Sequence, residues 1–290
     1  MKKITLLLIV CLTFFEGYNQ NPIAYSIFRN DGSEVTFNEM ANELALADVT
    51  LFGELHDNPI AHWLQHEICI WFNDNGNSLV LGAEMFETDN QLILNEYING
   101  LISQKRFEAE ARLWPNYTTD YKPLVEFAKV NNIRFIATNI PRRYASMVAS
   151  GGFEALDSLS ELAIQYIAPL PIEYNPELPG YKAMLSMMGM PGKANSKADN
   201  FPKAQAIKDA TMAWNISENL SNGGHFIHFH GTYHSNNYEG IVWYLKRYSP
   251  KVEYKTIATV LQNSADALND EHKGIADYII VVPERMTRTY

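Results

Sequence analysis

The sequence predicts an α/β protein with a central, mainly parallel sheet flanked by helices. Two observations predict this fold class. Short apolar segments that resemble buried strands alternate with segments that carry helix signals, an order typical of βαβ units. Hydrophobic residues make up 47% and charged residues 19% of the 290 residues, which is an ordinary globular composition. The predicted strands are 49–53, 78–83, 133–137, 225–229, 254–261 and 278–282.

Helices are predicted between these strands. The helix over 59–73 has Pro59 in its first turn and either Asp57 or Asn58 as its cap, positions that these residues favour. His62 and His66 are four residues apart and share one face of this helix. We interpret them as a solvated face rather than a metal-binding pair. The other predicted helices are 89–99, 119–131, 203–220 and 240–248.

The segment 165–202 departs from this pattern. Five prolines, the first of them Pro169, lie in the stretch from Pro169 to Asn200, and Tyr174, Tyr181 and four methionines accompany them. Because proline at this density breaks regular elements, we predict a Pro/Met/Tyr-rich helical insertion near 165–200. It is either a lid or binding loop or a surface excursion in which methionines fill gaps.

The first twenty residues are predicted to be a signal peptide. Lys2 and Lys3 precede an apolar run over 4–15, which is too short to span a bilayer but fits the core of a secretory signal. We therefore expect export to the periplasm or cell envelope, with 21–290 as a single domain. The bulky Val10 before Cys11 argues against a lipid anchor. Cys69 would then be the lone thiol, and we expect it to be buried.

Charge and cysteine content exclude several classes of protein. Lys and Arg number 23 against 33 Asp and Glu, a formal net charge of −10. A non-specific nucleic-acid binder needs a basic face, so no nucleic-acid partner is expected. Two cysteines in the whole chain exclude a disulfide scaffold and a Cys-based zinc site.

Polar residues follow the ends of four predicted strands. In an open α/β sheet, ligands bind beyond the carboxyl ends of the strands, so these side chains are expected to meet at one edge. They are Glu54 and His56, Glu84 and Glu87, Asn139 with Arg142 and Arg143, and His230 with His234.

Three interpretations of this edge remain open. His56 and His234 with Glu54 or Glu84 would make a His/His/carboxylate set suited to a divalent metal. Alternatively, Glu84 beside His56 would act as a general base without metal. The third interpretation is a buried polar network that fixes the strand ends and performs no chemistry.

An ordered set of motifs carries a family resemblance over about residues 35–285. The motifs include two Gly-x-x-His sequences, at 53–56 and 231–234, and a helical Asp-Ala-Thr-Met-Ala sequence at 209–213. The others are 82–87, Trp114 with 121–124, 138–142, Gly151-Gly152 and Ala204-Gln205. Together they resemble the ChaN-type haem-binding, iron-regulated envelope proteins, which belong to a wider group with the Tiki and TraB proteins and the erythromycin esterases.

The resemblance implies an exported protein of iron or haem acquisition. It implies haem as the ligand, a homodimer that encloses haem between subunits, and envelope haem-transport components as partners. It also implies that His56, Glu84 and His234 hold the shared pocket. The Tiki and esterase branches imply an alternative, a metal-dependent peptidase or esterase that uses these three residues. Binding is favoured, because the 209–213 and Gly-Gly motifs resemble the ChaN branch.

Haem requires an apolar slot, an axial ligand and donors for its two propionates, and the axial ligand is commonly His, Tyr, Met or Cys. A hard phenolate favours ferric iron. Tyr174 and Tyr181, with the methionines of the insertion, are candidates for the slot and the ligand, as is the His cluster that includes His56 and His234. Arg142 or Arg143 would meet the propionates. The net negative charge does not favour long-range steering of an anionic ligand.

Overall fold

The computed structural model describes residues 21–187, 199–220 and 223–290. The predicted signal peptide, including Cys11, and the residues Met188 and Met190 of the predicted insertion lie outside the described residues. Among the described residues, no helix is both long and apolar enough to cross a membrane.

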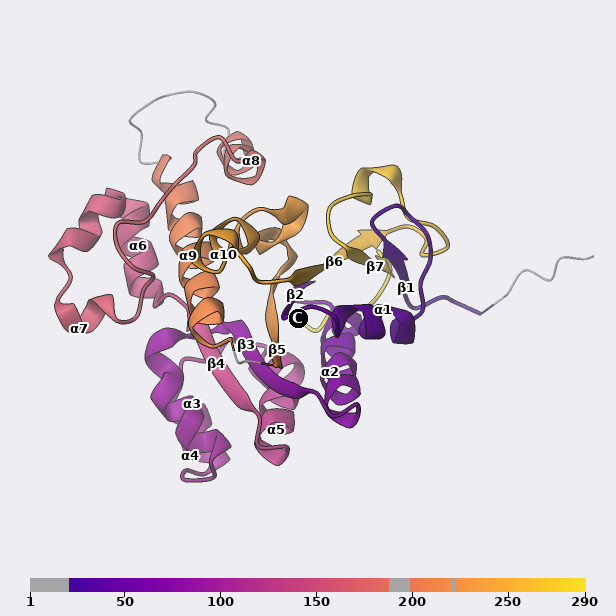
Figure 1. The fold of residues 1–290 in the computed structure, drawn as a ribbon, viewed down its shortest axis with the longest axis horizontal. Coiled ribbons are helices and arrows are strands. Elements are labelled where there is room, and N and C mark those ends of the chain that lie inside the picture. Colours follow the sequence, from indigo (N-terminus) through magenta and orange to yellow (C-terminus); the bar gives the residue numbers. More distant parts are fainter. Residues whose placement is uncertain (1–20, 188–198, 221–222) are drawn as a thin grey trace, which may run out of the picture.

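A seven-stranded sheet forms the centre of the molecule, in the order β1-β7-β6-β2-β5-β3-β4 (Figure 1). β1 pairs antiparallel with β7, and every other neighbouring pair is parallel. The predicted fold class is therefore confirmed. The strands are β1 Ser26–Arg29, β2 Val49–Glu54, β3 Ser78–Glu87, β4 Arg134–Asn139, β5 Gly224–Gly231, β6 Tyr254–Gln262 and β7 Tyr278–Pro283.

Helices cover both faces of the sheet (Figure 1). The core on one face joins the first five helices to side chains such as Phe52 and Phe229. The core on the other face joins α6, α8, α9 and α10 to Leu51 and Phe226. The helices are α1 Phe37–Leu44, α2 Pro59–Asp74, α3 Gln91–Ile98, α4 Gln104–Glu110, α5 Lys122–Val130, α6 Arg142–Gly151, α7 Glu161–Ile164, α8 Pro179–Met187, α9 Asn200–Glu218 and α10 Ile241–Tyr248.

Helix α2 shows how local signals fix an element beside the site. Asn58 is its N-cap and accepts a hydrogen bond from Ala61 N at 3.0 Å, and Pro59 occupies the first turn.

The expectation of a solvated histidine face on α2 is wrong for His62, which is 6% exposed. Its Nδ1 lies 3.4 Å from Glu54 and its Nε2 3.5 Å from Asp120, so two buried carboxylates draw the ring inward.

Two elements differ from the sequence-based expectation in a way that matters for the site. β3 continues to Glu87, so Glu84 belongs to the strand rather than to the loop after it. No helix was expected over 142–151, yet α6 fills this range. Pro141 before its first residue and Gly152 after its last, with φ +75°, are ordinary helix boundary signals.

Cys69 lies in the core on α2, with no exposed surface. Burial raises the pKa of its thiol, and the thiolate is the reactive form. We therefore expect native protein to resist labelling by Ellman's reagent for hours and to react once unfolded in guanidinium chloride. In native protein that lacks residues 1–20, and therefore Cys11, rapid labelling would show that Cys69 is accessible and would contradict this placement.

Candidate functional site

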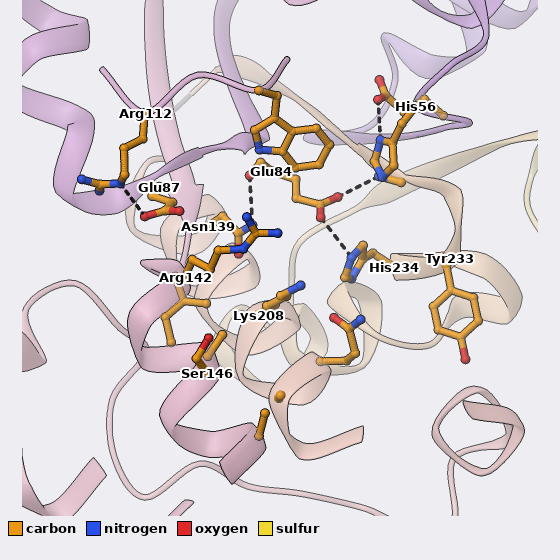
Figure 2. A pocket seen from close by; sticks show the side chains of 18 of the residues that line it. His56, Glu84, Glu87, Arg112, Asn139, Arg142, Ser146, Lys208, Tyr233 and His234 are labelled. Carbon is orange, nitrogen blue, oxygen red and sulfur yellow. Dashed lines mark hydrogen bonds and ion pairs between the residues drawn. The ribbon is translucent and has the colours of Figure 1, made fainter. Parts of the chain in front are cut away.

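A cavity of about 1020 Å³ lies at the carboxyl ends of the strands, between them and helices α6 and α9 (Figure 2). It is lined by side chains from all four of the strand ends that were predicted to converge. His56 follows β2, Glu84 lies in β3, Arg142 follows β4 and His234 follows β5. The topology explains this meeting, because β2, β5, β3 and β4 are consecutive parallel strands of the sheet.

His234 lies between two buried carboxylates. Its Nδ1 is 2.6 Å from Asp209 Oδ1 and its Nε2 is 3.3 Å from Glu84 Oε1. Burial lowers the pKa of His234, but the two carboxylates outweigh burial and raise it to about 10. The ring is therefore an imidazolium that donates from both nitrogens.

Glu84 lies between His56 and His234 in the cavity wall (Figure 2). It also accepts a hydrogen bond from Gly231 N at 2.9 Å. Burial raises the pKa of Glu84, yet the facing histidines and this hydrogen bond hold it well below its ordinary value. Glu84 is therefore a carboxylate with fixed partners.

The buried carboxylate of Glu54 fixes the position of His56. Its carboxylate accepts from His56 Nδ1 at 2.8 Å, from the Tyr121 hydroxyl at 2.7 Å and from Gln65 Nε2. Burial raises the pKa of Glu54, but its hydrogen bonds to His56 and His62 lower it overall. The outer part of the His56 ring remains accessible, with about a third of the side chain exposed. A carboxylate behind a histidine fixes the orientation of the ring.

The opposite wall carries positive charge from α6 and α9. Arg143 pairs with Asp89 and stacks on the Tyr144 ring. Arg142 on α6 and Lys208 on α9 also line the cavity. Within the described part of the chain, neither of these two cations has a hydrogen bond or ion pair. On α9, the buried Oε1 atom of Gln205 also lacks a hydrogen-bond partner.

The two tyrosines predicted as haem contacts do not line this cavity. Tyr181 is buried, and its hydroxyl donates to Asp209 Oδ2 at 2.8 Å. Tyr174 packs its ring against Phe153 and Tyr181. Of the described residues in 165–202, Phe201 lines the cavity.

The residues predicted as metal ligands, Glu54, His56, Glu84 and His234, all line the cavity, but they are directed at one another. The oxygens of Glu54 accept from protein donors, and both His234 nitrogens face carboxylates. Among the described residues, no group of three or more His, Cys, Asp or Glu is arranged to hold a metal ion.

Sequence reasoning missed several cavity residues. Arg112, Lys208 and Tyr290 line the cavity, and none of them was singled out. Tyr290 reaches it because Thr289 N donates to Asp57 O at 3.0 Å and Arg288 pairs with Asp57 at 2.9 Å. Tyr233 was singled out only within the second Gly-x-x-His motif. No local sequence signal brings the last residues to this edge.

A parallel sheet with a large, partly charged cavity at its carboxyl edge defines an α/β ligand-binding or catalytic domain. A comparison with protein families matches residues 40–245 to the family described as "Haem-binding uptake, Tiki superfamily, ChaN". The chain belongs to this family, and its predicted family resemblance is confirmed.

A comparison with solved structures finds similar chains. One is the structure titled "Cofacial heme binding to ChaN of Campylobacter jejuni", which is 16% identical, covers 89% of this chain and 96% of that chain, and has a TM-score of 0.65. Another is a Bacillus cereus protein, 12% identical over 86% of this chain and 92% of that chain, with a TM-score of 0.49. A mutant of the erythromycin esterase EreC in its open conformation is 11% identical over 82% and 77%, with a TM-score of 0.47. A comparison with curated proteins found no match.

Proposed function

We propose that this protein is an exported haem-binding protein of iron or haem acquisition and that haem binds in the cavity at the strand ends. The observation that carries the proposal is the cavity itself, which combines ample volume, apolar side chains and unpaired cations. Membership of a haem-binding family supports the choice of ligand.

The lining fits haem in size and in chemistry. Sites for drug-sized ligands have volumes of roughly 300–1,000 Å³, and this cavity is about 1020 Å³. Leu113, Trp114, Ile140 and Phe201 supply apolar surface for the flat faces of a porphyrin.

Among the described residues that line the cavity, three side chains are suited to iron. They are His56, Tyr233 and Tyr290, since imidazole and phenolate are both axial haem ligands. Bound haem would supply an iron atom with open coordination positions. Glu54 holds His56 by its Nδ1, and the other ring nitrogen faces Glu84 in the cavity wall (Figure 2), so an iron ligated by His56 would replace Glu84 at that nitrogen.

Export, assembly and transfer complete the proposal. We propose that residues 1–20 are removed as a signal peptide, and that the mature protein works in the periplasm or cell envelope. We also propose that haem binding is linked to homodimer formation and that envelope transport components receive the haem. The relative titled for cofacial haem binding supports the dimer.

Titration of the mature protein with hemin tests the proposal. We expect a saturable shift of the Soret band and, in sedimentation velocity, growth of a dimer as hemin is added. Tyr174→Phe and Tyr181→Phe are expected to leave the spectrum unchanged, because neither ring lines the cavity. Absence of saturable binding would overturn the proposed function.

Gly231 provides a local test of the cavity. A Cβ at this position would lie 2.8 Å from His56 Nε2 and 3.6 Å from Glu84 Oε2. The backbone of Gly231 has φ −58°, which any residue adopts. Gly231→Ala is therefore expected to fold and to push His56 aside, weakening hemin binding about tenfold or more. Gly151→Ala, whose new methyl would meet only Ala155, is the matched control. Equal hemin affinity in the two variants would place the ligand elsewhere.

The metal-dependent hydrolase using His56, Glu84 and His234 stays the alternative, and these three side chains lie together in the cavity wall (Figure 2). The predicted metal ligands are hydrogen-bonded to protein partners, and His234 is held as an imidazolium. Metal analysis of protein purified without chelators tests this alternative directly.

A further inference from the structure

We infer that Arg142 and Lys208 form a carboxylate-binding pair that grips the two propionates of a porphyrin and thereby sets its orientation in the cavity. This inference rests on the proposed function and names the contacts that would give it selectivity. It adds Lys208, which the sequence did not point to. It also assigns the propionate contact to Arg142 rather than to Arg143, whereas the sequence left either arginine possible.

The charged groups that line the cavity differ in whether they have a partner. Asp89 holds Arg143, and Glu87 and Asp89 hold Arg112. Carboxylates likewise hold His56 and His234. Within residues 21–187, 199–220 and 223–290, Arg142 and Lys208 are the lining cations without an acidic partner. They therefore remain available to an anion from outside the protein.

Arg142 and Lys208 also lie on the same side of the cavity. Arg142 is the first residue of α6 and Lys208 lies in α9, and both helices belong to the same core on this face of the sheet. Both side chains extend into the space beyond Glu84 (Figure 2). No side chain caps the first turn of α6, so the free N–H groups and the helix dipole add positive potential beside Arg142.

The charged residues that line the cavity differ from one wall to the other. Glu84 and Glu54 line the wall at the strand ends, whereas Arg142 and Lys208 line the wall at the helices. The carboxylates of the first wall are already paired with His56 and His234, so that wall offers no free positive charge, whereas the second wall attracts the carboxylates of a ligand. The porphyrin then enters with its propionates towards α6 and α9 and its centre towards the side of His56.

The chemistry of the two cations suits two separate carboxylates. The Arg142 guanidinium can bind one carboxylate through two parallel hydrogen bonds, and the Lys208 ammonium acts as a compact point charge. Lys208 is half-buried, where water screens its charge less than at an exposed position. The amide of Gln205, one turn earlier on α9, lines the same wall and adds a neutral polar contact.

The experiment compares hemin with hemin dimethyl ester, which lacks the two negative charges but keeps the iron and the ring. For the unaltered protein we expect the ester to bind at least tenfold more weakly than hemin, because charge-assisted hydrogen bonds are lost. Arg142→Met and Lys208→Met are each expected to weaken hemin binding about tenfold and to leave ester binding within about twofold.

The control is Lys251→Met, which removes the same charge from an exposed turn between α10 and β6. It should change neither affinity, which separates a direct contact from a change in net charge. Thermal unfolding of each variant confirms that it is folded. In Arg142→Met/Lys208→Met, the difference between hemin and its ester should shrink to about twofold.

The outcomes separate the inference from the proposed function. If hemin and its ester bind the unaltered protein equally, or if the variants weaken both alike, the carboxylate pair is wrong while haem binding stands. If neither compound binds, the proposed function itself fails. A selective loss of hemin affinity in both variants, absent in Lys251→Met, supports the pair.

Discussion

The free energy of unfolding is expected to fall steeply as the pH is lowered from about 6.5 towards 4. Three histidines of β5 are buried in this protein, His225, His228 and His230. Burial lowers the pKa of His225 to about 4 and that of His230 to about 3, and it lowers the pKa of His228 well below its ordinary value of 6.5. Each stays neutral in the folded chain, where Thr50 and Thr138 hold His225 and His228.

The sign of this effect follows from proton binding. Below pH 6.5 the unfolded chain takes up a proton on each of these histidines and the folded chain does not, so acid favours unfolding. Each histidine contributes a slope of about 1.4 kcal/mol per pH unit, or about 4 kcal/mol per pH unit for all three. The loss continues until the pH reaches the folded-state pKa of each residue.

Urea unfolding at closely spaced pH values between 7 and 4.5 measures this slope. His225→Gln is expected to reduce it by about one proton. Thr50→Val is the matched control, because it removes the partner of His225 Nε2 but leaves the histidine, so it lowers stability while keeping the slope. A profile that is flat over this pH range would show that these histidines are not held neutral.

Glu54→Gln is expected to destabilise the fold by about 3–5 kcal/mol, the cost of removing one partner from a buried ionic network. Glu54 is 1% exposed, and its carboxylate accepts from His56, Tyr121 and Gln65. A glutamine is the same size, but it presents an NH₂ group to donors and leaves the charge of His62 without its nearer counter-ion. The same change should release His56 and weaken hemin binding.

Guanidinium unfolding at pH 7 measures the stability loss. Glu43→Gln provides the control, because Glu43 is also a carboxylate with fixed partners, Arg29 at 2.6 Å and the Tyr278 hydroxyl, but its side chain is 43% exposed. An exposed pair of this kind contributes about 1 kcal/mol or less. If both variants lost the same stability, the Glu54 network would be no more important than a surface ion pair.

Six of the seven strands could be predicted from the sequence because they are short apolar runs between clear turn and helix signals, whereas the edge strand β1 was missed. The location of the cavity followed from one topological rule, since consecutive parallel strands place Glu84 and His234 at the same edge. This part of the site depends on backbone pairing, which sequence patterns report well.

The other site residues could not be predicted, because their positions depend on the direction of side chains in loops and in helices that have no distinctive sequence. Tyr181 looked like a ligand because it lies among prolines, yet its hydroxyl turns inward to Asp209. Lys208 is one of many lysines on helices, and only the packing of α9 beside α6 brings it to the cavity. Helix α6 was missed because the polar residues at its start were interpreted only as a strand end.

The anchored C-terminal residues bear on how the protein should be handled at the bench. Tyr290 lines the cavity, held there through Thr289 and Arg288. An affinity tag fused after Tyr290 would emerge at the rim, and a polyhistidine tag there would offer foreign imidazoles to the added hemin. Purification handles are therefore better placed away from Tyr290.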